Sequence, residues 1–461
     1  MAILDKLRPS KLLNFSNKAA PVSDRPDARI YARDEHNLSR KNIAESALKV
    51  LYRLHKAGFE AYLVGGAVRD LLLGFTPKDF DVATNARPEE VCDLFRNSRM
   101  IGRRFKLVHV RFGREIIEVA TFRAAPEGQS GDSAISDEGR ILRDNVYGEL
   151  VDDAWRRDFT INALYYNIAD FSIVDYVDGV NDLRAGRLRL IGEPDVRYLE
   201  DPMRLLRAVR FAAKLGVEID KQTERAFQTY GKLLKDISPA RMFDEIVKLF
   251  HCGAGARAVE LLIDYELMPL LFPSFSKIAN SGMLEQHTAM MSQACANTDK
   301  RLAAEKSVTP AFVLAAILWH AQRCYFDELN DQSLSPFDQE QRAHDRAIEE
   351  QLATIAIPRR FTSYVREIWS LQKKFTKRTP KRVERLASHR RFRTAYDFLL
   401  LRAECGENVG ELAAWWTQYE NGTAEQREAL LQNLSANKPK RRRRKNPKPK
   451  RNNQNDANGN A

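Results

Sequence analysis

Residues 65–70 read GGAVRD and residues 79–81 read DFD, and these two stretches decide the fold of the N-terminal part of the chain. The glycine pair closes an apolar run and precedes a short expected helix, after which Asp79 and Asp81 alternate with Phe80 in an expected strand. Since side chains alternate faces in a strand, the two carboxylates point the same way. Like charges on one face repel unless cations hold them, and Mg²⁺ prefers oxygen ligands. The sequence therefore predicts a phosphate cradle beside a two-metal carboxylate site, a combination suited to nucleotidyl transfer.

The glycine pair is expected to form the cradle. Gly65 and Gly66 carry no Cβ, so their backbone N–H groups are predicted to lie open to a phosphate. Arg69 falls one turn into the following helix, where it could reach a triphosphate. A glycine pair alone usually marks only a turn, and two aspartates could simply line a solvated strand. Their closeness in the sequence, and the depletion of Asp in strands, favour the nucleotide-binding interpretation.

Two residues compete for the role of a third catalytic carboxylate. Glu118 lies inside the apolar run 116–120, where a glutamate is costly unless it is paired or bound to a metal. Asp158 stands at the expected start of a helix, four residues before Asn162 and on the same face. Arg157 could bind phosphate, while Asp158 and Asn162 could hold ribose hydroxyls or a metal-bound water. An aspartate in this place is also an ordinary helix cap, so both alternatives stay open.

The segment 200–207, EDPMRLLR, is the next group of charged residues. Asp201 is expected to cap a helix with Pro202 at its first position, and Arg204 and Arg207 lie three apart on one face. An Asp that accepts from an exocyclic amine and an Arg that donates to a ring nitrogen together fit adenine or cytosine. Guanine and uracil would leave buried groups unpaired, at about 1–3 kcal/mol each. The sequence therefore predicts binding of ATP or CTP.

Two basic segments suggest a polyanionic partner. Residues 102–110, GRRFKLVHV, bring Arg103, Arg104 and Lys106 before a strand, where they could grip RNA or a triphosphate or form a solvated turn. The net charge is +12, and ten Lys and Arg residues without any acidic residue lie in 438–451, so the rest of the chain carries only +2. A proline-containing basic tail cannot bury apolar surface and is expected to be disordered, and RNA is its natural target. The tail residues predicted to bind RNA are Arg441, Arg442, Arg443, Arg444 and Lys445.

Composition limits the class of protein. At 461 residues, with 44% apolar and 30% charged residues, the chain has the balance of a globular protein with more than one core. It contains no apolar run of the roughly 18 residues that a membrane span needs, and its start lacks a signal-peptide core, so a cytoplasmic location is expected. The five cysteines are scattered without a C-x-x-C pair, which favours buried thiols over disulfides or zinc.

Strand and helix patterns divide the chain into a small α/β head and an all-helical remainder. Short strands are expected at 61–64, around 79–82, and at 109–112 and 116–121 as a hairpin about Gly113. A long loop is expected from Phe122 to Val151, and further strands at 172–176 and 188–191. After Ile191 helices dominate, including 203–215, 240–250, 256–265 and 311–320. The expected regions are a flexible segment 1–35, a head 36–190, a neck 191–255 for base and RNA binding, an RNA-binding helical body 256–432 and the basic tail 433–461.

The order of these motifs resembles that of a known superfamily. GGAVRD, the D-x-D, IIEVATFR (116–123), RRDFTINAL (156–164) and EDPMRLLRAVRF (200–211) are similar to the class II nucleotidyltransferases, which include tRNA CCA-adding enzymes and bacterial poly(A) polymerases. GRRFKLVHV together with RRRRK looks like the poly(A) polymerase I branch. The resemblance implies a palm-like sheet in the head, helical regions that hold RNA, and catalytic roles for Asp79, Asp81 and Asp158, with Glu118 as the rival for the third.

The same resemblance implies a reaction. Members of that branch extend RNA 3′ ends with AMP from ATP, using two Mg²⁺ ions and no template, in mRNA polyadenylation that promotes turnover. Contact with the RNA-decay machinery is also implied by the family. Two alternatives remain: a tRNA CCA-adding enzyme, which shares every core motif, and a non-catalytic RNA-binding protein on the same scaffold. The basic tail and GRRFKLVHV favour the polymerase.

Overall fold

The computed structural model of the chain describes residues 26–102, 106–124, 133–135, 141–329 and 334–436. It divides into two compact units, residues 1–365 and 366–461. The boundary falls inside α17 (Arg359–Thr376), within the segment 256–432 that the sequence predicts as one helical body. The helical body is therefore shared between two units. Arg103, Arg104 and the tail residues 441–445 lie outside the described residues.

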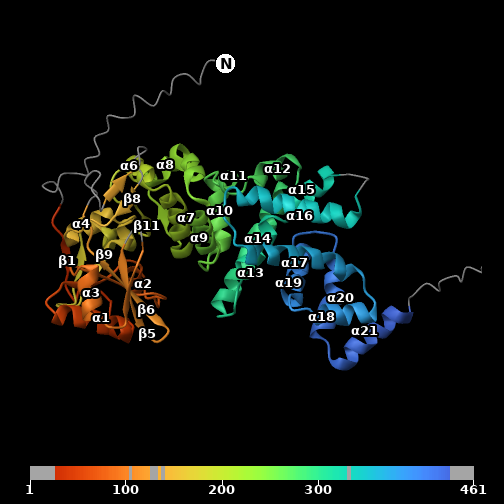
Figure 1. Ribbon diagram of the computed structural model, residues 1–461, viewed down its shortest axis with the longest axis horizontal. Coiled ribbons are helices and arrows are strands. Elements are labelled where there is room, and N and C mark those ends of the chain that lie inside the picture. Colours follow the sequence, from red (N-terminus) through yellow and green to blue (C-terminus); the bar gives the residue numbers. More distant parts are fainter. Residues whose placement is uncertain (1–25, 103–105, 125–132, 136–140, 330–333, 437–461) are drawn as a thin grey trace, which may run out of the picture. The chain divides into compact units, whose positions relative to one another are not determined.

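The head is built on an eight-stranded mixed sheet in the order β1-β10-β9-β2-β3-β6-β5-β4 (Figure 1). Strands β3 and β6 pair in parallel, and the other neighbouring strands of this sheet pair antiparallel. The strands are β1 (Arg29–Tyr31), β2 (Ala61–Val64), β3 (Asp81–Thr84), β4 (Ser98–Ile101), β5 (Leu107–Phe112), β6 (Glu115–Thr121), β9 (Leu164–Asn167) and β10 (Ile173–Asp175).

The two faces of this sheet are covered by different helices. Tyr62, Val64 and Ala83 form a buried cluster with α4 (Leu150–Arg156) on one face. Leu63 alternates with them, is fully buried, and therefore points to the opposite face. Helix α1 (Glu45–Lys56) packs against β2, β3 and β6, and α3 (Pro88–Leu94) packs against β4, β5 and β6. Helix α2 (Gly66–Leu72) follows β2 directly and contacts β2 and β9.

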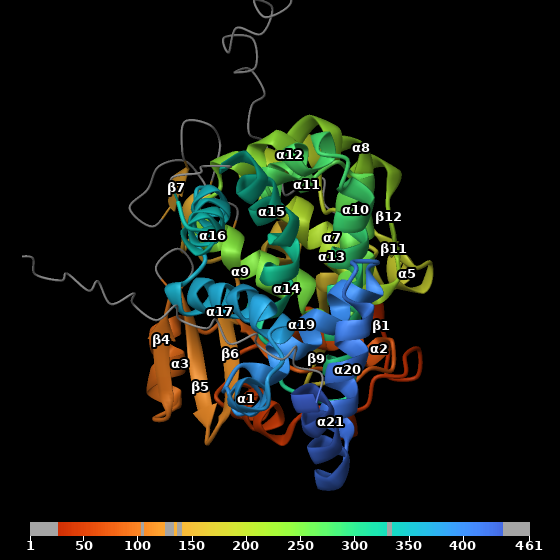
Figure 2. The ribbon, with the colours of Figure 1, turned by 90° about the vertical axis from the view of Figure 1, so that its right-hand side faces the viewer.

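Helices follow the head. After α5 (Gly179–Arg184), the short strand β11 (Arg187–Leu188) pairs with β12 (Glu218–Ile219), which joins the end of the head to the neck. Helices α10 and α13 lie side by side, as Figures 1 and 2 show. The helices of this part are α6 (Pro194–Glu200), α7 (Met203–Leu215), α8 (Lys221–Tyr230), α9 (Pro239–Phe250), α10 (Gly255–Asp264), α11 (Met268–Leu271), α12 (Ser274–Asn280), α13 (Leu284–Ala303), α14 (Pro310–Ile317), α15 (Trp319–Leu329) and α16 (Pro336–Leu352).

The C-terminal unit has a core of its own. Trp416 is buried against Phe375, at 5.0 Å between ring centroids, and its Nε1 donates to the carbonyl of Phe375 at 3.1 Å. Leu371, Leu386 and Phe392 belong to the same buried cluster. Its helices beyond α17 are α18 (Pro380–Ala387), α19 (Phe392–Glu404), α20 (Gly410–Asn421) and α21 (Ala424–Ala436).

The fold class predicted from the sequence, an α/β head followed by helices, is confirmed, and so are the hairpin about Gly113 and the helix 203–215. The expected loop from Phe122 to Val151 is wrong, because it contains the pair β7 (Ser133–Ile135) and β8 (Ile141–Asp144) and the start of α4. The ordered sheet also begins earlier than expected, with β1 inside the segment 1–35. The expected helix 311–320 is split between α14 and α15.

The strand expected around Asp79 begins at Asp81. Its neighbour β2 ends at Val64, which is the register partner of Asp81, and the chain turns away at Gly65. Residues before Asp81 therefore have no β2 backbone to pair with. Among the described residues, no helix is both long and apolar enough to span a membrane. Of the five cysteines, which the sequence predicts to be buried, Cys295 and Cys324 are buried, whereas Cys92, Cys252 and Cys405 are only partly buried.

Candidate active site

The turn between β2 and α2 forms one corner of the site. Gly65 has φ of +71°, a backbone conformation that favours glycine. A Cβ at this position would lie 3.4 Å from Nη1 of Arg157. The prediction that the N–H of Gly65 is open is wrong, because it donates to the carbonyl of Leu164 at 3.2 Å. Gly65 therefore provides the turn and the space in front of Arg157, while Gly66 begins the helix.

A group of carboxylates lies at the adjoining start of β3. Asp81 is the register partner of Val64 on one side and of Glu118 on the other, so Asp81 and Glu118 are neighbours on one face. Asp79 precedes the strand by two residues and is exposed. The pKa of Asp81 is raised to about 6, first by desolvation from the surrounding protein and then by the charge of Glu118, with a smaller contribution from Asp79. Three acidic groups thus act on one another at this corner.

Glu118 is only partly engaged by other residues. Its side chain is 51% exposed, and Oε1 lies 3.3 Å from Nε2 of His109 on the neighbouring strand β5. Within the described ranges, no three His, Cys, Asp or Glu side chains are already gathered closely enough to hold a metal ion. The carboxylates are therefore near neighbours that a cation would draw together.

Arg157 lies between the carboxylates and the glycine turn. Its Nε and Nη2 donate to Oδ2 of Asp153 at 3.1 and 2.9 Å, and Nε also donates to the hydroxyl of Tyr165 at 2.8 Å. Its positive charge lowers the pKa of Asp81 against the carboxylates that raise it. These contacts fix the guanidinium so that Nη1 faces Gly65. Arg157 is thus placed to meet an anion at the turn.

Asp158, the alternative third carboxylate, has different surroundings. It lies between α4 and the short 3₁₀ helix Thr160–Asn162, so the helix expected to start here is a single 3₁₀ turn. Its Oδ2 accepts from Nε of Arg207 at 2.7 Å and also from Nη2, and its Oδ1 accepts from Nδ2 of Asn162 at 3.1 Å. Burial alone would raise the pKa of Asp158, but the charge of Arg207 and these hydrogen bonds lower it. Asp158 is a paired carboxylate whose side chain is only 11% exposed.

This pair belongs to a larger network that joins the head to α7, which we name the arginine joint: Arg69, Asp70, Asp158, Asn162, Arg207, Phe211 and Lys214. Arg69 is 2% exposed, and its Nη1 donates to Oδ1 of Asn162 at 2.6 Å. Its Nε and Nη2 donate to Oδ1 of Asp70 at 2.8 and 2.5 Å. Lys214 of α7 lies 3.3 Å from the other oxygen of Asp70.

Phe211 occupies the centre of the joint. The guanidinium carbons of Arg69, Arg207 and Arg210 lie 5.1, 5.4 and 4.4 Å from its ring centroid. Phe159 packs edge-to-face on the same ring at 5.8 Å. Cation–π contacts contribute roughly 0.5–2 kcal/mol each, depending on burial. One aromatic ring therefore aligns arginines from the head and the neck.

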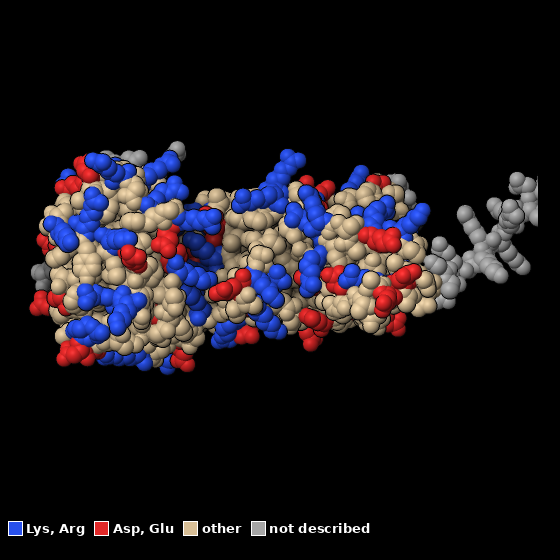
Figure 3. All heavy atoms as spheres, turned by 90° about the horizontal axis from the view of Figure 1, so that it is seen from below, with Lys and Arg blue, Asp and Glu red and all other residues tan. Residues whose placement is uncertain are grey.

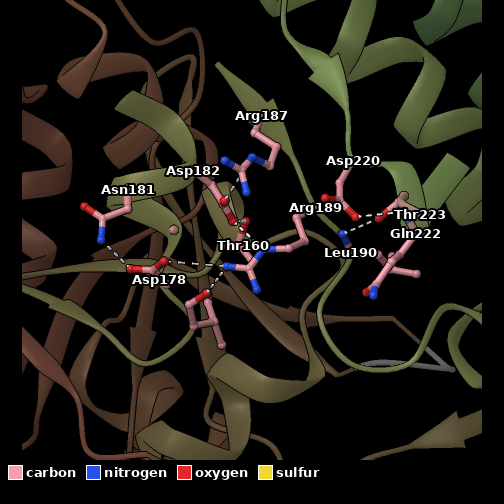
Figure 4. A network of polar contacts seen from close by, with 12 residues as sticks. Thr160, Asp178, Asn181, Asp182, Arg187, Arg189, Leu190, Asp220, Gln222 and Thr223 are labelled. Atoms are coloured by element: carbon pink, nitrogen blue, oxygen red, sulfur yellow. Dashed lines mark hydrogen bonds and ion pairs between the residues drawn. The ribbon is translucent and has the colours of Figure 1, made fainter. Parts of the chain in front are cut away.

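A second polar network holds the segment after Asp158 in place. Figure 4 shows Thr160 and Arg189 directed at Asp182, whose Oδ2 accepts from the Thr160 hydroxyl at 2.7 Å and from Nε of Arg189 at 2.8 Å. Gly179 allows this approach, because a Cβ there would meet the carbonyl oxygen of Thr160 at 2.2 Å. Leu190 donates its N–H to Oγ1 of Thr223 in α8 at 3.1 Å. The segment after Asp158 is thereby fixed to α5 and to α8 of the neck.

The expected base-reading pair has other partners in this structure. Asp201 accepts from Nη2 of Arg241 at 3.1 and 3.0 Å, whereas Nη1 of Arg204 donates to Oε2 of Glu200 at 2.9 Å. Asp201 also accepts from the N–H of Met203 at 3.3 Å, although Pro202 rather than Asp201 occupies the cap position of α7. A base that pairs with Asp201 and Arg204 would have to replace Arg241 and Glu200.

Basic side chains gather in one hollow of the molecular surface. Figure 3 shows Lys and Arg side chains gathered around a hollow between the head and the helices that follow it. Lys106 is exposed at the start of β5, and its N–H donates to Oδ1 of Asn145 at 2.9 Å. A polyanion would meet positive charge as it approaches this hollow.

Several residues of the site were missed by the sequence analysis, namely Asp153, Tyr165, Phe211, Lys214 and Arg241. Asp153 stands four residues before Arg157, and this spacing in the sequence could have indicated an ion pair along a helix. Arg241 contacts Asp201 from 40 residues away, and local spacing gives no sign of it.

A mixed sheet with clustered carboxylates at one end, a glycine turn beside them and an arginine-lined connection to a helical neck defines the class II nucleotidyltransferases. Comparison with known proteins agrees. Residues 61–189 match the family described as "Poly A polymerase head domain", residues 216–278 "Probable RNA and SrmB-binding site of polymerase A", and residues 332–450 "Polymerase A arginine-rich C-terminus".

The relatives separate the two enzymatic alternatives. Poly(A) polymerase I of Salmonella typhi is 45% identical over 432 residues, covering 92% of this chain and 93% of the relative. The CCA-adding enzyme of Lactobacillus helveticus is 40% identical over only 221 residues, 48% of this chain and 53% of the relative. The solved Bacillus stearothermophilus CCA-adding enzyme in complex with CTP has a TM-score of 0.55 and 25% identity, covering 85% of this chain and 92% of that one. The chain belongs to the poly(A) polymerase I family, and it is an enzyme.

Proposed function

We propose that the corner formed by Asp79, Asp81 and Glu118 transfers AMP from ATP to the 3′ end of RNA without a template. The observation that carries this proposal is geometric: Asp81 and Glu118 are register partners on neighbouring strands, Asp79 precedes Asp81 by two residues, and the adjoining glycine turn faces Nη1 of Arg157. A carboxylate that is shielded from water is usually stabilised by an ion pair with a cationic side chain, as Asp158 is by Arg207. Acidic groups left beside one another instead indicate a ligand with positive charge.

The donor set fits Mg²⁺. Asp79, Asp81 and Glu118 offer carboxylate oxygens, the ligands that Mg²⁺ prefers. When bound, two such ions would supply positive charge at the attacking RNA oxygen and at the departing pyrophosphate. We assign the holding of these ions to Asp79 and Asp81, with Glu118 rather than Asp158 as the third carboxylate.

The protein groups have distinct roles in the proposed reaction. The RNA 3′-oxygen forms a bond to the α-phosphorus of ATP as the bond to the bridging oxygen breaks and pyrophosphate leaves. Gly65 and Gly66 leave room for the triphosphate, and Arg157 meets its charge through Nη1. Arg69, Asn162 and the Asp158–Arg207 pair position this wall of the site against α7.

Base selection is assigned to Asp201 and Arg204. Both are held by ion pairs, Asp201 with Arg241 and Arg204 with Glu200, so binding of adenine exchanges one set of partners for another. Asp201→Ala and Arg204→Ala should relax the choice of base. Arg241→Ala, which removes only the competing partner, should leave that choice intact, and unchanged selectivity in the first two variants would contradict the assignment.

The test of the function is the product. The full chain is incubated with Mg²⁺, an RNA of defined 3′ end, and ATP or CTP separately, and the product is sized. We expect a long ladder of added A residues and little incorporation of C. A stop after a few additions would instead support a CCA-adding activity, and absence of any metal-dependent product would support a non-catalytic RNA-binding protein. A cytoplasmic location and contact with RNA-decay machinery remain predictions from the sequence.

A further inference from the structure

A cationic cavity lies in the C-terminal unit, between the end of α17 and α18. Its volume is about 360 Å³, within the roughly 300–1,000 Å³ typical of ligand sites. Two lysines from the end of α17 and its following turn and two arginines from α18 form its charged rim, and all four side chains are exposed. We name this cavity the basic pocket, and its rim residues are Lys374, Lys377, Arg382 and Arg385.

The floor of the basic pocket is apolar and firmly packed. Leu371 and Leu386 line it and are also members of the buried core around Trp416. His389, half-buried, closes the floor, and its Nδ1 accepts the N–H of Arg391 at 3.1 Å. That hydrogen bond fixes the ring at the edge of the cavity. The pocket therefore combines apolar and aromatic lining residues with charge around its rim.

The rim cations differ in their ion pairing from several other arginines of the same unit. Arg390 and Arg391 both pair with Glu367, at 2.8 and 3.1 Å, and Arg402 pairs with Glu407 at 2.9 Å. In the described part of the chain, no ion pair with a carboxylate is present for any of the four rim residues. The described part of the unit thus supplies acidic partners to Arg390, Arg391 and Arg402 but none at the pocket.

The simplest alternative is a solvated face of an amphipathic helix. Helix α18 does bury Val383 and Leu386 and expose its charges. A solvated face, however, needs no cavity and no second element, whereas here cations from two helices converge on one space. Bringing like charges together is unfavourable, and a bound anion relieves that repulsion.

We propose that the basic pocket binds one nucleotide of single-stranded RNA, with the base on the floor of Leu371, Leu386 and His389 and the flanking phosphates at the rim. This inference rests on the proposed function, which makes RNA the substrate. A base needs an apolar or aromatic platform and its phosphates need cations, and single-stranded sites combine the two. Duplex RNA keeps its bases stacked inside, so it cannot use the floor. An acidic peptide would use the rim charges but leave the apolar floor without purpose.

The test measures RNA binding by the full chain, which does not depend on catalysis. Arg385→Gln removes one rim charge, and the double variant Lys377→Gln/Arg385→Gln removes two. Lys381→Gln is the control for loss of charge on α18, because Lys381 is exposed on the same helix but does not line the pocket. With a fluorescent 25-nucleotide single-stranded RNA, the Kd should rise about tenfold for the double variant Lys377→Gln/Arg385→Gln. The slope of log K against log salt should fall by about 0.7 for each phosphate that the variant no longer neutralises. Lys381→Gln should change neither quantity.

Two further measurements decide between ligands. His389→Ala should weaken binding of single-stranded RNA several-fold and leave duplex RNA of equal length unaffected, since only the unpaired base reaches the floor. Equal losses for both RNAs would overturn the placement of the base. An unchanged Kd and salt slope in the double variant would overturn the pocket, while adenylation by the wild-type protein would still support the proposed function. Weakened capture of a poly-glutamate peptide with unaltered RNA binding would assign the pocket to an acidic peptide and overturn the inference.

Discussion

Asp81 and Asp158 are both carboxylates of the head, but among the described residues only Asp158 of the two forms an ion pair. Asp81 has Glu118 and Asp79 near it, and its pKa is raised to about 6, chiefly by desolvation. Asp158 is buried against Arg207 and Asn162, and its pKa is lowered. The first arrangement costs stability unless a cation arrives, and the second stabilises the fold as it stands. The comparison separates residues that act on a ligand from residues that position the site.

The largest expected effect is on catalysis at the carboxylate corner. Asp81→Asn should lower the rate of AMP incorporation roughly 1,000-fold, because each 1.36 kcal/mol of lost transition-state stabilisation is tenfold in rate and a bound metal contributes several. Stability should be unchanged or slightly higher, since one of three neighbouring negative charges is removed. Single-turnover kinetics and the thermal midpoint test both statements, and RNA binding should persist. Near-normal incorporation would contradict the assignment.

Asp158→Asn should act mainly on stability. It leaves the part-buried Arg207 without its charged partner, and loss of a hydrogen-bonded charged partner costs about 1–3 kcal/mol. Because the folded-state pKa of Asp158 is lowered, its stabilisation is fully present above the unfolded-state value of about 3.9 and is lost as the pH falls through the folded-state pKa. Urea unfolding should therefore separate wild type and variant at pH 7 and less so in acid. Equal stability at pH 7 would show that the pair is not structural.

Glu118→Gln decides the third carboxylate. The side chain is half exposed, and its one ion-pair contact among the described residues is with His109 at 3.3 Å, so stability should not change. If Glu118 helps to hold divalent ions, activity should fall about tenfold or more, and part of it should return at higher Mg²⁺ concentration. A plot of rate against Mg²⁺ checks this. Full activity at every concentration would return the role to Asp158.

Phe211→Leu should give the smallest effect. It removes the ring on which three arginines lie and should weaken the joint by about 1–2 kcal/mol, with a several-fold rise in the KM for ATP and little change in kcat. Phe211→Tyr should restore the KM. Phe227→Leu is the matched control, because Phe227 is equally buried but packs on Tyr198 and Tyr265 in the neck. An equal rise in KM in the control would mean that only general stability matters.

The features that the sequence predicted correctly are those that depend on residues close together in the chain. The hairpin about Gly113 and helix α7 are set by patterns within a few residues. The joint is different, because Arg69 meets Asn162 across 93 residues and Arg207 meets Asp158 across 49. Tertiary packing decides such pairs, so the sequence could name the charged residues but not their partners. The short edge strand β1 was missed for the same reason, since its pairing with β10 is long-range.

The most direct test compares two variants, Asp81→Asn and Asp158→Asn, prepared and assayed under the same conditions. AMP incorporation and the thermal midpoint of unfolding are measured for each. The expected result is an enzyme that is folded but inactive in the first case and one that is destabilised in the second. A stable, active Asp81→Asn protein would contradict the account, because the β3 carboxylates would then have no part in the chemistry.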